Sequence, residues 1–479
     1  MSRMGIKSRR AVALVTVLFL LVAGGVLALY LTSTSRREVT TSSSAAYDAY
    51  RSGVDNLRRF YTKEARVDFA RALSLDPNFA MAMLRLAGLS NQDQYKSLVE
   101  RASKLRGRLN ERERLWVDLY MTGEKGSREE RLKIAKELHE KYPDDIDAAH
   151  WLAGDEMAQG RTDEAIRIMM GLLAQDPNIA DVYNQCGYYY AFRGEYEKAV
   201  ENVKKYQFMA PDQANPWDSL GEIQAYMGHY DEAIANLNKA LSLKPDFFES
   251  HYHLGVAYEG KGLPDKAIEQ YLAAAQEALT DGKRMDLYAS VMRTGIVSEN
   301  AAAVRDAARR VAQLPKNKDS EVWNAFTESA LDLAEGRPAG AEKRLAELRP
   351  RLLEQFTKDN RDPERKPFFP VWNGLMALAK ARQGKIDEAI ALYEQNVNPP
   401  NRADAFEGRR SIFEARARLA ALLAKKGDLD RAEKLLAENK AWNPSWAPTR
   451  PAELVVEQAR RDKVLAAAAA DNGDRKGAR

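Results

Sequence analysis

Residues 217–234 read "WDSLGEIQAYMGHYDEAI", and residues 251–268 repeat the pattern as "HYHLGVAYEGKGLPDKAI". Two further copies lie upstream at the same step. They are "YNQCGYYYAFRGEYEKAV" over residues 183–200 and "AHWLAGDEMAQGRTDEAI" over residues 149–166. A fixed period of this length is typical of repeat architectures, in which each unit buries its apolar side against its neighbours.

The small residues and prolines recur in phase. They are Gly160, Gly194, Gly228 and Gly262, then Ala165, Ala199, Ala233 and Ala267, then Pro177, Pro211 and Pro245. We expect Gly228 to end one helix, because a residue without a Cβ adopts a left-handed turn easily. Pro245 is expected to stop the next helix. Each unit is therefore predicted to be two antiparallel helices, which approach closely where Gly221 and Ala233 lie. A large side chain at these positions is predicted to overpack the pair.

This pattern resembles the tetratricopeptide repeat. The signature positions of that family are occupied here by Trp217, Leu220, Gly221, Ala233, Leu237, Ala240 and Pro245. Gln224 replaces the usual tyrosine, although the next copy has Tyr258 at that position. The resemblance implies an all-α, right-handed α-solenoid of stacked helix-turn-helix units that binds other proteins. The four units over residues 146–279 carry the pattern in full.

The remaining segments are assigned around these four units. We expect a cytoplasmic basic tail (1–10), a transmembrane helix (11–31), a Ser/Thr-rich tether (32–43), divergent N-terminal helical pairs (44–145), the four regular units (146–279), degenerate helical repeats (280–360), a connector (361–369), C-terminal repeat-like units (370–445), a capping helix (451–470) and a disordered tail (471–479). The N-terminal pairs are loosely similar to the repeat region of bacterial transmembrane regulators. Only ten residues precede the apolar segment, so no cytoplasmic output domain is expected from that likeness.

The apolar segment "AVALVTVLFLLVAGGVLALYL" at residues 11–31 contains no charged residue. As a helix it would be about 31 Å long, close to the roughly 30 Å hydrocarbon core of a membrane. Four basic residues precede it and two follow soon after. This asymmetry favours a signal anchor in a bacterial cytoplasmic membrane, with the N-terminus inside and the repeats outside. The alternative is a signal peptide cleaved after "VLA" at residues 26–28, which would leave a secreted or periplasmic soluble protein.

Composition and motifs give no sign of catalysis. The net charge of the 479 residues is only +4, and Cys186 is the single cysteine, so an intrachain disulfide is excluded. Metal, phosphate-loop and serine-nucleophile motifs are absent. His251 and His253 are two residues apart on one expected helix, so they point to different faces and cannot chelate one ion together. We therefore expect no enzyme, no cofactor and no metal, with an unrecognised active site in residues 283–314 as an alternative.

In the resembled family the first helix of each unit lines the concave inner surface. The corresponding residues here are Asp147, His150, Asp181, Asn184, Tyr188, Phe192, Asn215, Asp218, Glu222, Tyr226, Glu249, Tyr252 and Glu259. We call this set the first-helix face. It holds acids and aromatic rings but no Lys or Arg, which favours a basic or mixed basic–apolar peptide of a protein partner. It argues against a carboxylate clamp and against nucleic acid. The alternative, if the first segment is cleaved, is an exported protein that binds peptides or glycans.

Overall fold

All regular elements of the chain are helices wherever the structure describes it. The computed structural model describes residues 39–125, 127–316, 320–357, 368–397, 406–443, 445–446, 448 and 450–477, and no strand occurs among them. The predicted all-α class is therefore confirmed. The expected membrane helix over residues 11–31 lies outside the described residues, as does most of the expected connector. No helix in the described part of the chain is both long and apolar enough to cross a membrane.

The chain divides into two compact units, of which the first is formed by residues up to 54 together with residues 64–131. Its helices are α2 (Ser44–Arg58, whose last residues belong to the second unit), α3 (Thr62–Leu75), α4 (Ala80–Gly88), α5 (Gln92–Lys104), the short 3-10 helix η1 (Arg106–Arg108) and α6 (Glu111–Lys125). The aromatic ring of Tyr50 lies 5.7 Å from that of Phe69 and 4.9 Å from that of Phe79, centroid to centroid. These rings build the core of this unit, and both Phe69 and Phe79 are fully buried.

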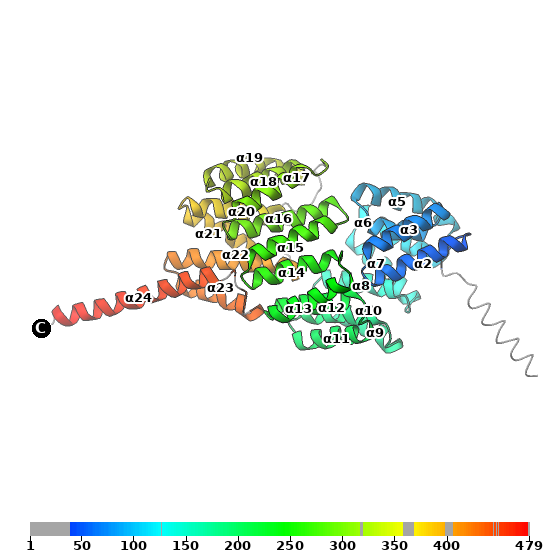
Figure 1. Ribbon diagram of the computed structural model, residues 1–479, viewed down its shortest axis with the longest axis horizontal. Helices are drawn as coiled ribbons and strands as arrows, with labels where there is room; N and C mark the ends of the chain where they lie inside the picture. The colour runs from blue at the N-terminus through cyan, green and yellow to red at the C-terminus, as the bar shows by residue number, and fades with distance from the viewer. Residues whose placement is uncertain are drawn as a thin grey trace, which may run out of the picture. The chain divides into compact units, whose positions relative to one another are not determined.

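The second unit contains residues 55–63 and 132–479, and it holds the regular repeats. Helix α7 (Arg128–Lys141) leads into it. The hairpins that follow are α8–α9 (Ile146–Ala158, Thr162–Gln175), α10–α11 (Ala180–Phe192, Tyr196–Met209), α12–α13 (Ala214–Met227, Tyr230–Leu243), α14–α15 (Phe248–Gly260, Pro264–Glu277), α16–α17 (Asp281–Val297, Ala301–Ala312), α18–α19 (Ser320–Ala334, Pro338–Thr357), α20–α21 (Phe368–Arg382, Ile386–Val397) and α22–α23 (Phe406–Lys425, Leu429–Trp442). Within this unit, Figure 1 shows successive hairpins stacked side by side along the chain. Helix α24 (Arg450–Gly477) follows the last hairpin.

The end of α24 differs from the sequence-based expectation. The sequence suggested a helix that stops at residue 470 and a disordered tail, whereas the helix continues to Gly477. The alanines over residues 466–470 have the highest helix propensity of any residue type, and no proline follows them. The helix continues past these alanines through Asn472 and Gly473, although both residues have low helix propensity.

The turn inside each regular hairpin uses the same backbone conformation. Gly228 has φ 83°, in the left-handed region, and it is the C-terminal cap of α12. Its N–H donates to the carbonyl of Ala225, and the N–H of His229 donates to the carbonyl of Gln224. The glycines at the same phase in the other units, Gly160, Gly194 and Gly262, have φ between 75° and 81°. The predicted helix end at Gly228 is confirmed.

A second in-phase glycine brings the two helices together in three of the four regular hairpins, and the first hairpin has Ala153 at this phase. A Cβ at Gly221 would stand 2.7 Å from Cγ of Leu237 and 3.0 Å from the carbonyl oxygen of Ala233. Gly187 and Gly255 meet Val203 and Tyr271, which occupy the phase of Leu237 in their own hairpins, in the same way. These three hairpins therefore pack without room for one methyl group at this phase, as the sequence predicted for Gly221.

The segment between α23 and α24 packs back onto the turns of the third and fourth regular hairpins. The amide of Asn443 donates to the carbonyl of Ala225 at 3.1 Å, and its Oδ1 accepts from the hydroxyl of Tyr230 at 3.1 Å. Trp446 is 5% exposed and belongs to the same hydrophobic core cluster as Tyr230 and Leu254. The last hairpin is thereby joined to hairpins that lie far earlier in the chain.

We expect Gly221→Ala to lower the free energy of unfolding by about 1–3 kcal/mol, because the added methyl group must displace Leu237 or the backbone at Ala233. Thermal and urea unfolding followed by circular dichroism would measure the change. Gly154→Ala is the matched control, because a Cβ at Gly154 in α8 would meet nothing within 4 Å. It should stabilise the helix by roughly 0.5–1 kcal/mol. Equal effects of the two substitutions would contradict the packing described here.

Candidate partner-binding surface

All residues of the predicted first-helix face lie in the first helices of the four regular hairpins, α8, α10, α12 and α14. The structure divides them into two groups by exposure. The buried group is Asn184, Asn215, Asp218, Glu222, Tyr226 and Glu259, and the partly exposed group is Asp147, His150, Asp181, Tyr188, Phe192, Glu249 and Tyr252. The pattern along one helix could not separate the two groups, because burial here depends on neighbouring repeats.

The middle of the face is a network of hydrogen bonds across three helices. The hydroxyl of Tyr188 on α10 donates to Oε2 of Glu222 on α12 at 2.6 Å. Asp218, one turn earlier on α12, accepts from the hydroxyl of Ser250 on α14 at 2.7 Å. The Nδ1 atom of His253 lies 3.0 Å from Oδ1 of Asp218, and its Nε2 lies 3.4 Å from Oε1 of Glu222. We call Tyr188, Asp218, Glu222, Ser250 and His253 the polar cluster.

The repeat itself places these residues together. Glu222 follows Tyr188 by one full repeat, and His253 follows Asp218 by one repeat and one further position. Successive first helices lie next to one another in the stack, so equivalent positions of adjacent repeats come into contact. Tyr188, Asp218 and Glu222 belong to the predicted face, whereas His253 and Ser250 were missed. Neither residue stands exactly one repeat after an acid of the face, so a comparison in steps of one repeat does not find them.

Glu259, at the far end of α14, is also satisfied from inside the protein. It is 5% exposed, accepts from the Tyr271 hydroxyl at 2.8 Å, and forms an ion pair with Arg293 of α16 at 2.7 Å. Arg293 also pairs with Glu414 of α22. This carboxylate is therefore already neutralised by the chain's own arginine.

Helix α16 extends the first-helix face and brings basic residues to it. Lys283 and Arg293 each stand one full repeat after Glu249 and Glu259, so they occupy the same phases in the next hairpin. The Nζ atom of Lys283 lies 5.6 Å from the ring centre of Tyr252 and 5.8 Å from that of Phe248. Both basic residues were missed because the regular repeats were predicted to end at residue 279. One further step of the period would have found them.

Glu249, in the first turn of α14, has a strongly perturbed carboxyl group. Burial raises its pKa to about 8, and the negative charge of Asp218 adds to the effect, while His253 and Lys283 oppose it. The carboxyl therefore keeps its proton over much of the neutral range. A cation that approached Glu249 would favour its ionised form.

His251 and His253 point to different faces of α14, as the sequence predicted. The two histidines diverge, because Nδ1 of His251 contacts Oε1 of Gln270 at 2.8 Å while His253 faces Asp218. Cys186 is fully buried in the core. Burial raises the pKa of its thiol to about 12, so it is not a thiolate at neutral pH.

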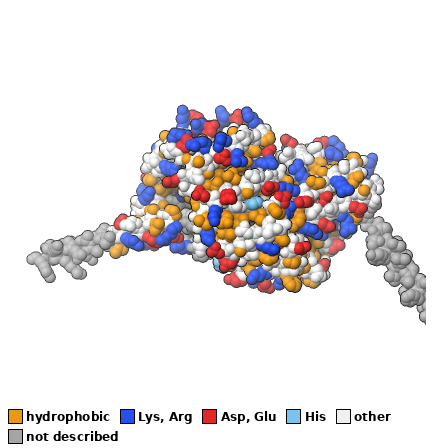
Figure 2. All heavy atoms as spheres, viewed as in Figure 1, with side chains coloured by type: hydrophobic (Ala, Val, Ile, Leu, Met, Phe, Trp, Pro, Cys, Tyr) orange, Lys and Arg blue, Asp and Glu red, His pale blue; other side chains and the backbone are white. Residues whose placement is uncertain are grey.

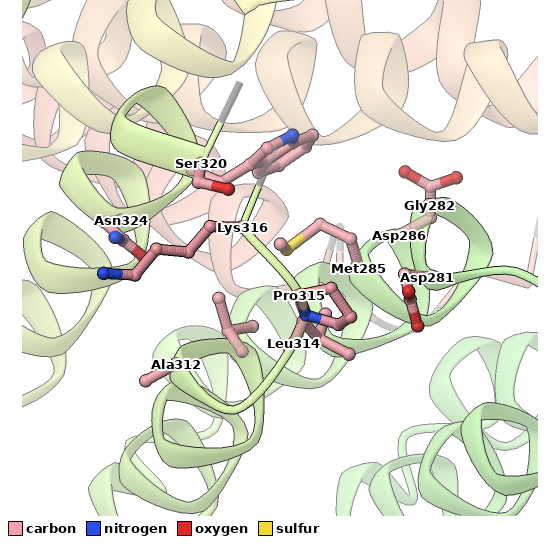
Figure 3. A pocket seen from close by; sticks show the side chains of 12 residues that line it. Asp281, Gly282, Met285, Asp286, Ala312, Leu314, Pro315, Lys316, Ser320 and Asn324 are labelled. Atoms are coloured by element: carbon pink, nitrogen blue, oxygen red, sulfur yellow. The ribbon is translucent and has the colours of Figure 1, made fainter. Parts of the chain in front are cut away.

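A small cavity lies at the ends of α16, α17 and α18, in the region named for an unrecognised active site. It measures about 170 Å³, and its apolar lining includes Met285, Leu314 and Trp323. Figure 3 shows the carboxylates of Asp281 and Asp286 on one side and Lys316 on the other. No histidine or cysteine is among the residues that line it.

Comparison with known proteins identifies the repeat in part of the chain. A family model described as "TPR repeat" matches residues 211–262, and a model described as "Tetratricopeptide repeat" matches residues 248–279. Residues 211–279, which form α12 to α15, are thus tetratricopeptide repeats. Stacked repeats of this kind present extended surfaces for other proteins, so the broad class of the chain is a protein–protein interaction scaffold. A comparison with curated proteins finds no match.

Several solved structures resemble the chain at low identity. The crystal structure of the APC/C hetero-tetramer Cut9-Hcn1 is 18% identical, with a TM-score of 0.44 over 86% of this chain and 76% of that one. A tetratricopeptide repeat protein from Parabacteroides merdae is 15% identical, with a TM-score of 0.37 over 56% of this chain and 98% of that one. MamA is 24% identical, with a TM-score of 0.28 over 33% of this chain and 93% of that one. These matches say nothing about a ligand of this chain, and the loose likeness to transmembrane regulators stays a prediction.

The pKa of Glu249 predicts how stability depends on pH. The folded protein holds this proton more tightly than the unfolded chain, so the free energy of unfolding falls as pH rises from about 4.5 to about 8. Glu249→Gln has no carboxyl group to ionise at this position, so this decrease in the free energy of unfolding is absent in the variant. The variant should be more stable than the wild type by about 1–2 kcal/mol at pH 8.5, after allowance for partial exposure, and nearly equal to it at pH 4.5.

Thermal unfolding at the two pH values measures this difference. Glu269→Gln, at an exposed position of α15, is the matched control for the loss of one carboxyl group. A Glu249→Gln variant whose advantage did not change with pH would contradict the assignment.

Proposed function

We propose that the chain is a membrane-tethered scaffold whose first-helix face binds a basic or mixed basic–apolar segment of a partner protein. The observation that carries this proposal is a row of acids in the first turns of α8, α10 and α14. Asp147, Asp181 and Glu249 form the row, and all three are partly exposed. A partner's Lys or Arg side chains would complement them.

The buried acids of the face have a different role from the row. Asp218 and Glu222 are held by Tyr188, Ser250 and His253, so they shape the surface from below instead of contacting a ligand directly. A basic peptide is therefore expected to bind along the row and beside the aromatic rings. Figure 2 shows acidic and hydrophobic side chains next to one another over the middle of the larger unit, which suits a ligand of mixed character.

Lys283 supports the mixed basic–apolar preference. Its ammonium lies over the rings of Phe248 and Tyr252, so an amine is accommodated beside the acidic first turn of α14 by cation–π contacts. A partner lysine that reached the rings of Tyr188 or Phe192 on α10 would find similar aromatic surfaces near Asp181. The chain's own lysine thus serves as an internal example of the chemistry proposed for the ligand.

Binding can be tested with labelled peptides of a dozen residues that combine Lys and Arg with Leu and Phe, against matched peptides with Asp and Glu. We expect the basic set to bind preferentially and more weakly as salt rises. The double variant Asp147→Lys, Asp181→Lys should weaken binding at least about tenfold. The matched control is Glu197→Lys, Glu232→Lys, which reverses two exposed charges on the second helices α11 and α13.

Two results would overturn the proposed face. One is equal binding of the acidic and basic peptides by the wild-type protein. The other is an equal loss of basic-peptide binding in the two double variants, because it would show that total charge and not this row governs capture.

The membrane tether rests on the sequence of residues 11–31, which combines an uncharged stretch of membrane length with basic residues before it. We expect the full chain, expressed in a bacterium, to sediment with membranes and to resist extraction at high pH. N-terminal sequencing should find residues 11–31 still attached. A mature protein that begins after residue 28 and stays in the soluble fraction would instead establish the exported alternative.

A further inference from the structure

We propose that Asp218, Glu222 and His253 bind one divalent first-row transition-metal ion, such as Zn²⁺, Co²⁺ or Mn²⁺, which links α12 to α14. One ligand atom from each residue can be chosen so that all three lie within 4.8 Å of one another, and all three side chains are buried. No metal was expected from the sequence, because a single motif does not contain this ligand set. The three residues come from two adjacent repeats.

The distances suit a metal ion with nitrogen and oxygen ligands. Such ions hold their ligands at about 2.0–2.2 Å, which separates neighbouring ligand atoms by about 3.0–3.4 Å and opposite ones by about 4.2 Å. His253 Nδ1 is 3.0 Å from Asp218 Oδ1, and Nε2 is 3.4 Å from Glu222 Oε1. Each ring nitrogen thus has one carboxylate oxygen at ligand spacing. One ion binds only one of the two nitrogens, so the carboxylate on the other side of the ring must turn toward it, and ligand atoms of all three residues already lie within 4.8 Å of one another.

The charge of the cluster also favours a divalent ion. Asp218 is 2% exposed and Glu222 is 7% exposed, and the ion pairs described for both are with His253. A protonated imidazole brings one positive charge to two carboxylates. A divalent ion bound to a neutral imidazole brings two, so it balances both carboxylates where burial makes an excess charge costly.

The carboxylates are oriented from behind by hydroxyl groups. Ser250 donates to Oδ1 of Asp218 and Tyr188 donates to Oε2 of Glu222, while both oxygens of Asp218 and Oε1 of Glu222 lie near the imidazole of His253. Partners of this kind fix metal ligands and raise their affinity. Asn184, one turn before Tyr188 on the same helix, is 2% exposed, and its Oδ1 has no hydrogen-bond partner among the described atoms. It offers a further oxygen on this face.

The ligand set predicts which ions bind. Imidazole with two carboxylates suits first-row transition metals, whereas Mg²⁺ and Ca²⁺ prefer oxygen ligands and more of them. We therefore expect Zn²⁺, Co²⁺ or Mn²⁺ to bind and Mg²⁺ to compete poorly. The ion would add a bond between two repeats that already meet through packing and the hydrogen bonds to Asp218, so it should also raise the unfolding temperature.

The full chain, stripped with a chelator and dialysed, can be titrated with Zn²⁺ by calorimetry. We expect a site of near-unit stoichiometry that is lost in His253→Gln and weakened at least about tenfold in Glu222→Gln. The matched control is His251→Gln, which removes a histidine from the same helix outside the cluster and should leave the site intact. Addition of Zn²⁺ should raise the unfolding temperature by several degrees in the wild type and in His251→Gln, but not in His253→Gln.

A second measurement guards against variants that fail to fold. Co²⁺ added to the wild-type protein should give visible absorption bands from a nitrogen- and oxygen-ligated ion, and Zn²⁺ should displace them. The proposal is overturned if the wild-type protein binds neither Zn²⁺, Co²⁺ nor Mn²⁺ with a dissociation constant below about 100 µM. It is equally overturned if folded His253→Gln and His251→Gln bind the ion alike.

Discussion

The close approach of two helices at one glycine phase is the constraint on which the regular repeats depend. At Gly221 the space that a methyl group needs is already filled by Leu237 and by the backbone at Ala233. The same contact recurs at Gly187 and Gly255, so the helices approach closely in three consecutive hairpins, α10–α11, α12–α13 and α14–α15. Identical stacking is what brings equivalent residues of successive repeats together. The polar cluster and the acidic first turns both follow from it.

The sequence was sufficient for the hairpins because their determinants are local. A left-handed glycine such as Gly228 and a stopping proline such as Pro245 act within a few residues, so their spacing predicts helix ends directly. The composition of the first-helix face was also readable, since one helical phase selects it. The exposure of the residues on this face could not be predicted in the same way. Whether Asp218 faces solvent or His253 depends on the repeat beside it, which a search along one helix does not include.

The same limit explains why the basic residues of α16 were not predicted. The motif weakens after residue 279, yet α16 continues the stack. Arg293 stands one repeat after Glu259, at the same phase, and forms an ion pair with it. The structural period therefore extends beyond the part of the sequence that carries the consensus. Acid and base in successive repeats pair with each other, and the face changes character from acidic to mixed along the array.

The return of Asn443 and Trp446 to the turns of α12 to α15 changes how such an array can assemble. An open array can form progressively as the ribosome releases each hairpin, because every new unit needs only the one before it. Here two middle hairpins gain their last buried partners from residues made much later in synthesis. Their maturation must then wait for the end of translation. A chain that is truncated by a premature stop codon would leave these turns uncovered, and cellular quality control could recognise it by that apolar edge.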